Sequence, residues 1–377
     1  YMNIKILKMK LFAKIAAICF SMALFVSCGN ADDDVKFGVN PGGQGPGGGD
    51  LGIGKPVDDC LKLGDGELVL SIQNQSTALP GKVSIFFKVS DAQGNPVSGL
   101  KADQFTIYEQ GRNDTCFNTI STSESYAKIS PNSQIFNNNT ILVLDLSNSV
   151  LSSSLTELQA ATVSFIENVM PASDSESFKM AIYWFDGEDK LHSLEPLTHV
   201  KQDLIAAVQE ITKDISNDPS TDLYGAVIKS TDIAGKLLSE STTNGRIGAA
   251  SVVIFTDGTD QASRYTQSAA VKKVTDADKN ISFFSIGLGE EIDADILRKL
   301  GKTLSVNANN NTQLEATFNQ ISERVSERAN SFYLFEYCSP KRDGSGESNL
   351  AIQVKAGSRQ GSVQTKFNAK GFTGGCK

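Results

Sequence analysis

The side chains best suited to chemistry stand at the end of an apolar run. In the segment LVLDLSNS, residues 142–149, an aliphatic stretch is followed by a carboxylate and two hydroxyls at alternate positions: Asp145, Ser147 and Ser149. A hard cation such as Mg²⁺ takes about six oxygen ligands in near-octahedral geometry. One short loop therefore offers half of a magnesium coordination shell.

Two further oxygen-bearing residues occupy comparable positions later in the chain. Thr221 follows the polar loop KDISNDPS and opens a helical pattern, and Asp257 closes the apolar run SVVIFTDG. In an open α/β sheet, ligands bind outside the carboxyl ends of the strands. We therefore expect Thr221 and Asp257 to join the first loop in one metal site, although each residue alone could serve only as a helix N-cap or turn residue.

The elements that must position these residues alternate between strand and helix over residues 136–330. Such alternation predicts an α/β fold with a doubly wound, mainly parallel sheet that has helices on both faces. The run at 140–147 is almost continuously apolar, as expected for a strand that is covered on both sides. Strands are expected at 140–147, 178–187, 249–258, 280–289 and 303–308, and helices at 154–170, 200–212, 221–238, 266–278, 293–301 and 311–329.

The regions on either side have the pattern of a small all-β module. Alternating β-rich runs bounded by Gly, Pro and Asn predict strands there. We place an N-terminal β module at 57–135 and C-terminal strands, packing with it, at 331–377, while 119–139 is expected to be a loop. The predicted strands are 67–74, 82–91, 105–109, 331–338, 349–356 and 362–371.

Cysteine usage indicates an exported protein with disulfides in the β module. Outside the leader and its boundary the chain has an even set of four cysteines, Cys60, Cys116, Cys338 and Cys376, and none of them lies in the α/β region. Small exported modules often depend on such cross-links. Three pairings can be drawn for four cysteines, and the sequence does not choose among them.

The N-terminus has the features of a targeting signal. A basic stretch is followed by the apolar run IAAICFSMALFV and then by Ser27 and Cys28. LFVSC resembles the lipoprotein box of bacteria, which implies a signal peptide at 1–27 and lipidation of Cys28; a plain secretory signal is the alternative. Residues 28–56 are Gly-rich and are expected to form a tether. This implies a lipid-anchored protein of the bacterial envelope, with the outer membrane favoured and its periplasmic or surface face left open.

Composition and motifs exclude several classes of function. The net charge is −8, and about −12 once the four leader lysines are removed, which disfavours nucleic acid as a partner. No phosphate-binding loop is present, so no nucleotide is expected. We expect His192 and His199 to lie at the surface, without carboxylate or cysteine partners. With no catalytic triad order and no suitably placed base, we predict that the protein is not an enzyme.

Taken together, the Asp145-Leu146-Ser147-Asn148-Ser149 segment, Thr221 in STDLYGA and Asp257 in FTDG resemble the metal-ion-dependent adhesion site of von Willebrand factor A domains. The resemblance covers about residues 138–330. It implies that these five residues bind Mg²⁺, with Mn²⁺ or Ca²⁺ as alternatives. It also implies that an acidic residue of a protein ligand completes the coordination shell.

The resulting hypothesis is a metal-dependent, adhesion-type binding protein held at the membrane by a lipid anchor. Two other functions stay open from the sequence. One is a structural or assembly scaffold of the envelope in which the metal only orders the loops. The other is a metal-dependent hydrolase, which is disfavoured because no base or nucleophile can be identified.

Overall fold

The computed structural model describes residues 56–63, 66–130, 136–344 and 346–376. The predicted signal peptide, the lipidation site Cys28 and the tether up to residue 55 lie outside the described residues. Among the described helices, none combines the length and apolar character needed to cross a membrane.

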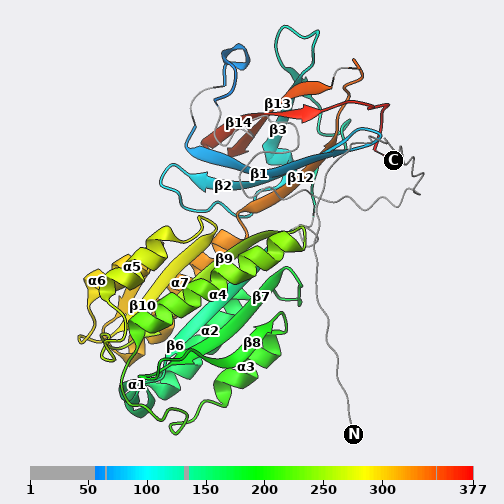
Figure 1. The fold of residues 1–377 in the computed structure, drawn as a ribbon. Coiled ribbons are helices and arrows are strands. Elements are labelled where there is room, and N and C mark those ends of the chain that lie inside the picture. The colour runs from blue at the N-terminus through cyan, green and yellow to red at the C-terminus, as the bar shows by residue number, and fades with distance from the viewer. Residues whose placement is uncertain (1–55, 64–65, 131–135, 345, 377) are drawn as a thin grey trace, which may run out of the picture. The chain divides into compact units, whose positions relative to one another are not determined.

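A six-stranded sheet forms the centre of the α/β region, with the strand order β11-β10-β9-β6-β7-β8 (Figure 1). All neighbouring strands run parallel except β8, which pairs antiparallel with β7 at one edge. The predicted doubly wound, mainly parallel sheet is confirmed. The strands are β6 (Phe136–Asp145), β7 (Phe178–Phe185), β8 (His192–Thr198), β9 (Ile247–Thr256), β10 (Ile281–Leu288) and β11 (Leu304–Ala308).

Helices cover both faces of this sheet because successive strand residues point to opposite sides. Leu142 and Leu144 of β6 pack in one buried cluster with residues of α2, α3 and α7, whereas Ile141 and Val143 pack in another with residues of α4, α5 and α6. The helices are α1 (Asn148–Ser153), α2 (Leu155–Val169), α3 (Lys201–Gln209), α4 (Leu223–Thr243), α5 (Gln267–Asp276), α6 (Ala294–Leu300) and α7 (Leu314–Ala329), with a 3₁₀ turn, η3 (Asn311–Gln313), before α7.

Two antiparallel four-stranded sheets form the β module, in the orders β1-β2-β12-β5 and β14-β13-β3-β4. Two of the three described strands that follow the α/β region occupy inner positions, because β12 lies between β2 and β5 and β13 lies between β14 and β3, whereas β14 is an edge strand. The elements are η1 (Asp59–Leu61), β1 (Leu68–Ala78), β2 (Lys82–Asp91), η2 (Ala102–Gln104), β3 (Phe105–Gln110), β4 (Asn118–Ile120), β5 (Lys128–Ser130), β12 (Phe332–Cys338), β13 (Glu347–Ala356) and β14 (Arg359–Asn368).

Two disulfides cross-link the β module, Cys60–Cys116 and Cys338–Cys376. Both cysteines of the first pair precede the α/β region, and both of the second follow it. Where the chain leaves and re-enters the module, Phe86, Phe136 and Phe332 pack together, with ring centroids 4.9–5.8 Å apart. A buried aromatic cluster therefore joins β2, β6 and β12 at the root of the α/β region.

Two parts of the expected secondary structure were wrong. The segment predicted as a loop at 119–139 contains most of β4, all of β5 and the first residues of β6. The stretch that connects β7 to α3 contains β8, which the sequence pattern did not indicate. β4, β5 and β8 lie at sheet edges, where the burial that produces a clear hydrophobic pattern is weakest. The first residues of β6 are mostly buried but include Asn137, Asn138 and Asn139, a residue type that is depleted in strands.

Candidate metal centre

Asp145, the last residue of β6, is the buried anchor of the candidate metal centre. Its side chain has 0% exposure, and two groups hold it in place. The Thr256 hydroxyl at the end of the neighbouring β9 donates to Oδ2 over 2.7 Å, and the Ser147 backbone N–H donates to Oδ1 over 2.9 Å. The ends of two adjacent parallel strands thus fix the orientation of one carboxylate.

Ser147 and Ser149 connect this carboxylate to Asp257. Ser147 stands at the N-cap position of α1, but its side chain forms no capping hydrogen bond. Its Oγ lies 3.2 Å from Ser149 Oγ, and the Ser149 hydroxyl donates to Asp257 Oδ1 over 2.9 Å. The structure therefore brings four of the five predicted residues into one chain of polar contacts at the carboxyl ends of β6 and β9.

Thr221 is held between the same loops through backbone contacts. Its carbonyl oxygen accepts hydrogen bonds from the N–H groups of Gln261 and Ala262, at 2.8 and 3.0 Å, in the loop that follows Asp257. The loop that leads into Thr221 is tied to the first loop, because the Asn148 N–H donates to the Pro219 carbonyl over 3.2 Å. Thr221 is buried and is not the cap of α4, a role that Asp222 fills.

The two carboxylates of this centre are electrostatically unfavourable as anions. Burial raises the pKa of Asp145 from 3.8 to about 7, and the nearby charge of Asp257 adds to the rise. Burial also raises the pKa of Asp257, with a further contribution from Glu291. Within the described part of the chain, no Lys, Arg or His forms an ion pair with either carboxylate. A bound cation would compensate the charge of the buried Asp145 and of the half-buried Asp257.

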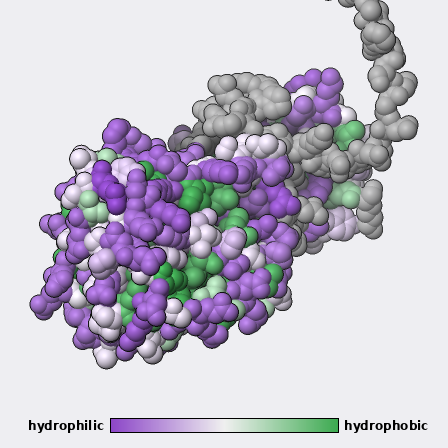
Figure 2. Space-filling view, turned by 60° about the horizontal axis from the view of Figure 1, so that its bottom comes forward, coloured by the Kyte–Doolittle hydropathy of each residue, from purple (hydrophilic) through white to green (hydrophobic). Residues whose placement is uncertain are grey.

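The donor set fits a hard divalent cation. It consists only of carboxylate and hydroxyl oxygens, which are the ligands that Mg²⁺, Mn²⁺ and Ca²⁺ prefer, and it contains no sulfur or imidazole. Ser149 is exposed while Asp145 and Ser147 are buried, so an ion held here would have one side open to a ligand. Figure 2 turns the end of the α/β region that carries α1 toward the viewer, and this surface is mostly hydrophilic with hydrophobic residues exposed among the polar ones.

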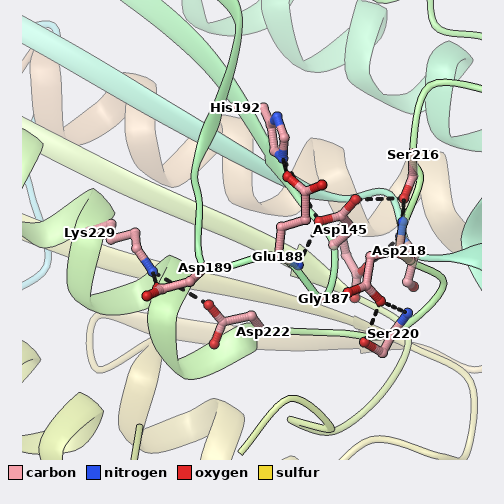
Figure 3. Close-up of polar contacts among 12 residues, drawn as sticks. Asp145, Gly187, Glu188, Asp189, His192, Ser216, Asp218, Ser220, Asp222 and Lys229 are labelled. Carbon is pink, nitrogen blue, oxygen red and sulfur yellow. Dashed lines mark hydrogen bonds and ion pairs between the residues drawn. The ribbon is translucent and has the colours of Figure 1, made fainter. Parts of the chain in front are cut away.

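A second polar cluster follows β7 and was missed by the sequence prediction. His192 Nε2 lies 3.8 Å from Asp186 Oδ1 and 3.4 Å from Glu188 Oε2, and Figure 3 shows the His192 ring and the Glu188 carboxylate pointing toward one another. His199 also has a carboxylate partner, since its Nδ1 lies 3.2 Å from Glu176 Oε1. The expectation that both histidines lack carboxylate partners was therefore wrong. The sequence signal that could have revealed this cluster was the four-residue spacing between Glu188 and His192.

Gly187 allows this second cluster to lie against the loop that leads to Thr221. A Cβ at Gly187 would lie 1.9 Å from Ser220 Oγ and 2.3 Å from Asp218 Oδ1, distances that no real contact permits. The Gly187 carbonyl also accepts a hydrogen bond from Arg264 Nη2 over 2.8 Å. The turn after β7 therefore packs against the loop that contains Asp218 and Ser220 and is hydrogen-bonded to the loop that contains Arg264.

Comparison with known proteins identifies the class of domain. Residues 139–324 match the family model of the von Willebrand factor type A domain, so the chain contains a domain of this family, as the motif residues predicted. No curated protein matched the sequence.

Solved structures with a similar fold come from diverse organisms. One is described as von Willebrand factor type A from Catenulispora acidiphila, with 11% identity, coverage of 81% of this chain and 74% of that chain, and a TM-score of 0.43. Another is the manganese-loaded TRAP protein of Plasmodium vivax, with 13% identity, coverage of 65% and 98%, and a TM-score of 0.41. A third is proximal thread matrix protein 1 from the mussel byssus with a zinc-occupied MIDAS motif, with 13% identity, coverage of 51% and 48%, and a TM-score of 0.40.

Proposed function

We propose that this protein is a metal-dependent binding protein of the adhesion type. In this proposal Asp145, Ser147, Ser149, Thr221 and Asp257 hold Mg²⁺. An acidic side chain of a protein ligand then completes the coordination shell of the ion, so that the metal forms part of the interface itself.

The observation that carries the proposal is the continuous contact path from Asp145 through Ser147 and Ser149 to Asp257. It joins the buried carboxylate of Asp145 and the half-buried carboxylate of Asp257, neither with a basic partner among the described residues, to the exposed Ser149. Such an arrangement is costly without a cation, because isolated buried carboxylates are strongly disfavoured. An ion at this place would offer an open coordination position to a carboxylate from outside.

The cellular setting is part of the same proposal. The basic and apolar leader, Cys28 and the Gly-rich tether support a lipid-anchored protein of the bacterial envelope, with the outer membrane favoured. The two disulfides of the β module fit an oxidising compartment outside the cytoplasm. A tethered domain would present the metal centre at a distance from the membrane surface.

The experiment is a capture assay with purified protein and envelope extract in Mg²⁺ and again in chelator. We expect a specific partner to be retained in Mg²⁺ and released by chelator, and Asp145→Ala to abolish retention while circular dichroism stays unchanged. Ser149→Ala should weaken retention. Its matched control is Ser152→Ala, because Ser152 lies in the same helix, is exposed and donates its hydroxyl hydrogen bond to the Ser149 carbonyl.

Retention that persists in chelator, or in Asp145→Ala, would contradict the proposed clasp. If chelation lowered the melting temperature but left the partner bound, the scaffold function would be supported instead. Direct Mg²⁺ titration of the same variants by calorimetry separates loss of the ion from loss of the partner, because the ion can be measured without any ligand.

A further inference from the structure

We propose that Asp186, Glu188 and His192 form a second metal site, which binds a transition-metal ion of the Zn²⁺ class. This site is separate from the five-residue centre and does not depend on the function proposed above. It is built from the turn between two paired strands, and its ligands include an imidazole nitrogen, which the first centre lacks.

The β7–β8 hairpin brings the three residues together. Asp186 directly follows β7, Glu188 lies in the turn, and His192 is the first residue of β8. Because β8 runs antiparallel to β7, His192 is the cross-strand partner of Trp184. The His192 ring therefore lies beside the turn that contains Glu188. Residues separated by up to six positions therefore point their polar ends into one space.

The distances between the ligand atoms suit a metal ion. His192 Nε2 lies 3.4 Å from the Glu188 carboxylate and 3.8 Å from the Asp186 carboxylate, and the potential ligand atoms of all three residues lie within 4.8 Å of one another. Ligand atoms on a tetrahedral ion with bonds of about 2.0–2.2 Å lie roughly 3.3–3.6 Å apart. An ion could therefore be accommodated with small side-chain adjustments.

An unsatisfied buried atom points independently to a missing partner. His192 Nε2 is inaccessible to solvent, yet it forms no hydrogen bond with any group of the described structure. Neither carboxylate meets hydrogen-bond geometry with this nitrogen, although both lie close to it. Leaving a buried polar atom without a hydrogen bond is unfavourable, because the atom has lost its water and gained no partner in exchange. A metal ion between the nitrogen and the two carboxylates would satisfy all three groups together.

The surroundings hold the ligands in fixed orientations, as is usual around metal sites. The Asp186 side chain is fully buried; its Oδ2 accepts a hydrogen bond from the Ser216 hydroxyl over 2.6 Å and its Oδ1 accepts one from the Glu188 N–H over 2.9 Å. The His192 ring stacks on Trp184 with centroids 3.8 Å apart and planes at 7°. Two of the three ligands are thus positioned before any ion arrives.

The ligand types select a different ion from the first centre. Imidazole favours Zn²⁺, Ni²⁺, Co²⁺ and related metals, whereas an all-oxygen set favours Mg²⁺ and Ca²⁺. An excess of Mg²⁺ should therefore occupy the first centre and leave the second one free for Zn²⁺ or Co²⁺. This difference allows the two sites to be measured separately in the same molecule.

The chain contains one tryptophan, Trp184, and its stacking on His192 makes it a built-in reporter. The test is a Co²⁺ titration of the full chain in excess Mg²⁺, followed by tryptophan fluorescence, since bound Co²⁺ quenches a nearby indole. We expect saturable quenching that Zn²⁺ reverses by competition. Glu188→Gln keeps the stacked pair but removes a ligand, so it should weaken the apparent Co²⁺ affinity by about tenfold or more.

Three further variants make the result decisive. Asp145→Asn should leave the quenching intact, because it affects only the first centre. His192→Gln should lose bound Zn²⁺ in equilibrium dialysis, and His199→Gln, seven positions further along, is its matched control and should retain the ion. Absence of saturable quenching, unchanged affinity in Glu188→Gln, or loss of quenching in Asp145→Asn would overturn the proposal. Circular dichroism of each variant establishes that it is folded.

Discussion

Asp145 is completely buried, and its proposed role as a metal ligand requires a negative charge. In the metal-free protein, burial and the neighbouring Asp257 raise its pKa to about 7, so at neutral pH a proton and a cation compete for this carboxylate. Serine and threonine hydroxyls do not compensate a charge as a cation does. The chemistry of the centre is therefore set by how strongly a divalent ion displaces the Asp145 proton.

We predict that Mg²⁺ stabilises the protein more at pH 8 than at pH 5. The unfolded chain releases the Asp145 proton near pH 3.8, whereas the metal-free folded protein keeps it up to about pH 7. Between these values the folded state binds more protons, so the free energy of unfolding of the metal-free protein falls as pH rises, by on the order of 4 kcal/mol. Bound Mg²⁺ removes this penalty.

The measurement is the difference in melting temperature between Mg²⁺ and chelator at several pH values. This difference should grow between pH 5 and about pH 7 and level off above it, where the carboxyl group of Asp145 is already ionised. In Asp145→Asn, which is neutral throughout and binds the ion poorly, the difference should be small at every pH. A difference that is constant across this range in the natural sequence would contradict the coupling of the ion to the Asp145 proton.

At this scale the sequence placed the five residues of the proposed centre at one sheet edge because strand ends can be recognised locally; that they hold an ion stays a prediction. Asp145 and Asp257 directly follow apolar runs, and parallel strands bring such ends to one edge. His192 was misassigned because its partners depend on the hairpin between β7 and β8. That strand pairing cannot be recognised from the residues around His192 alone, because β8 has no clear strand pattern in the sequence.

At the scale of elements, the position of the Thr221 loop depends on a close approach of the turn after β7. Ser220 donates from its hydroxyl and its N–H to Asp218 Oδ1, over 2.7 and 3.0 Å, which shapes the two turns that lead to Thr221. Gly187 leaves room for these groups. The turn at Gly187 and the loop before Thr221 are thus packed so closely that a methyl group at Gly187 would collide with the side chains of Ser220 and Asp218.

We predict that Gly187→Ala weakens Mg²⁺ binding by about tenfold and destabilises the protein by about 1–3 kcal/mol, since the added methyl forces Ser220 and Asp218 to move. Calorimetric Mg²⁺ titration and thermal melting test this. The control is Gly235→Ala in α4, where a Cβ would meet no atom within 4 Å. This variant should leave Mg²⁺ binding unchanged and slightly raise the stability of the protein. Equal Mg²⁺ affinities in the two variants would contradict the role assigned to Gly187.

The elements that sequence patterns predicted well are those with long buried faces. The ten residues of β9 are buried throughout, and such a run has an unmistakable apolar pattern. In contrast, no residue of the edge strand β8 is fully buried, and β8 contains Pro196, which demotes a run as a strand candidate. The short strands β4 and β5 span three residues each, too few for any periodicity.

At the scale of the whole molecule, the β module is closed by strands from both ends of the described chain. β12 pairs with β2 on one side and β5 on the other, and β13 pairs with β3 and β14. The α/β region is therefore an insertion into the module, attached where Phe136 of β6 packs against Phe332 of β12. Sequence composition indicated a β module on both sides but could not give the strand order, which depends on contacts far apart in the chain.

We predict that a chain ending at Asn330 loses the β module but keeps a folded α/β region. The truncation removes β12, β13 and β14, so β2 and β5 lose the strand that lies between them and β3 loses its partner β13. Limited proteolysis should then degrade residues 56–130 rapidly while a Mg²⁺-binding fragment that begins near residue 136 survives. The double variant Cys338→Ser/Cys376→Ser, which keeps every strand, should resist this degradation. Equal protease resistance of the truncated and full chains would contradict this interleaved architecture.

The central claim is that side chains more than a hundred positions apart hold one divalent ion at the rim of the sheet. The most direct test is an anomalous difference map from crystals grown with Mn²⁺. We predict a strong peak about 2.0–2.3 Å from the hydroxyl oxygens of Ser147 and Ser149, adjacent to Thr221 and Asp257, and its absence in Asp145→Ala crystals. A map without a peak at this place, from crystals in which both loops are ordered, would contradict the account.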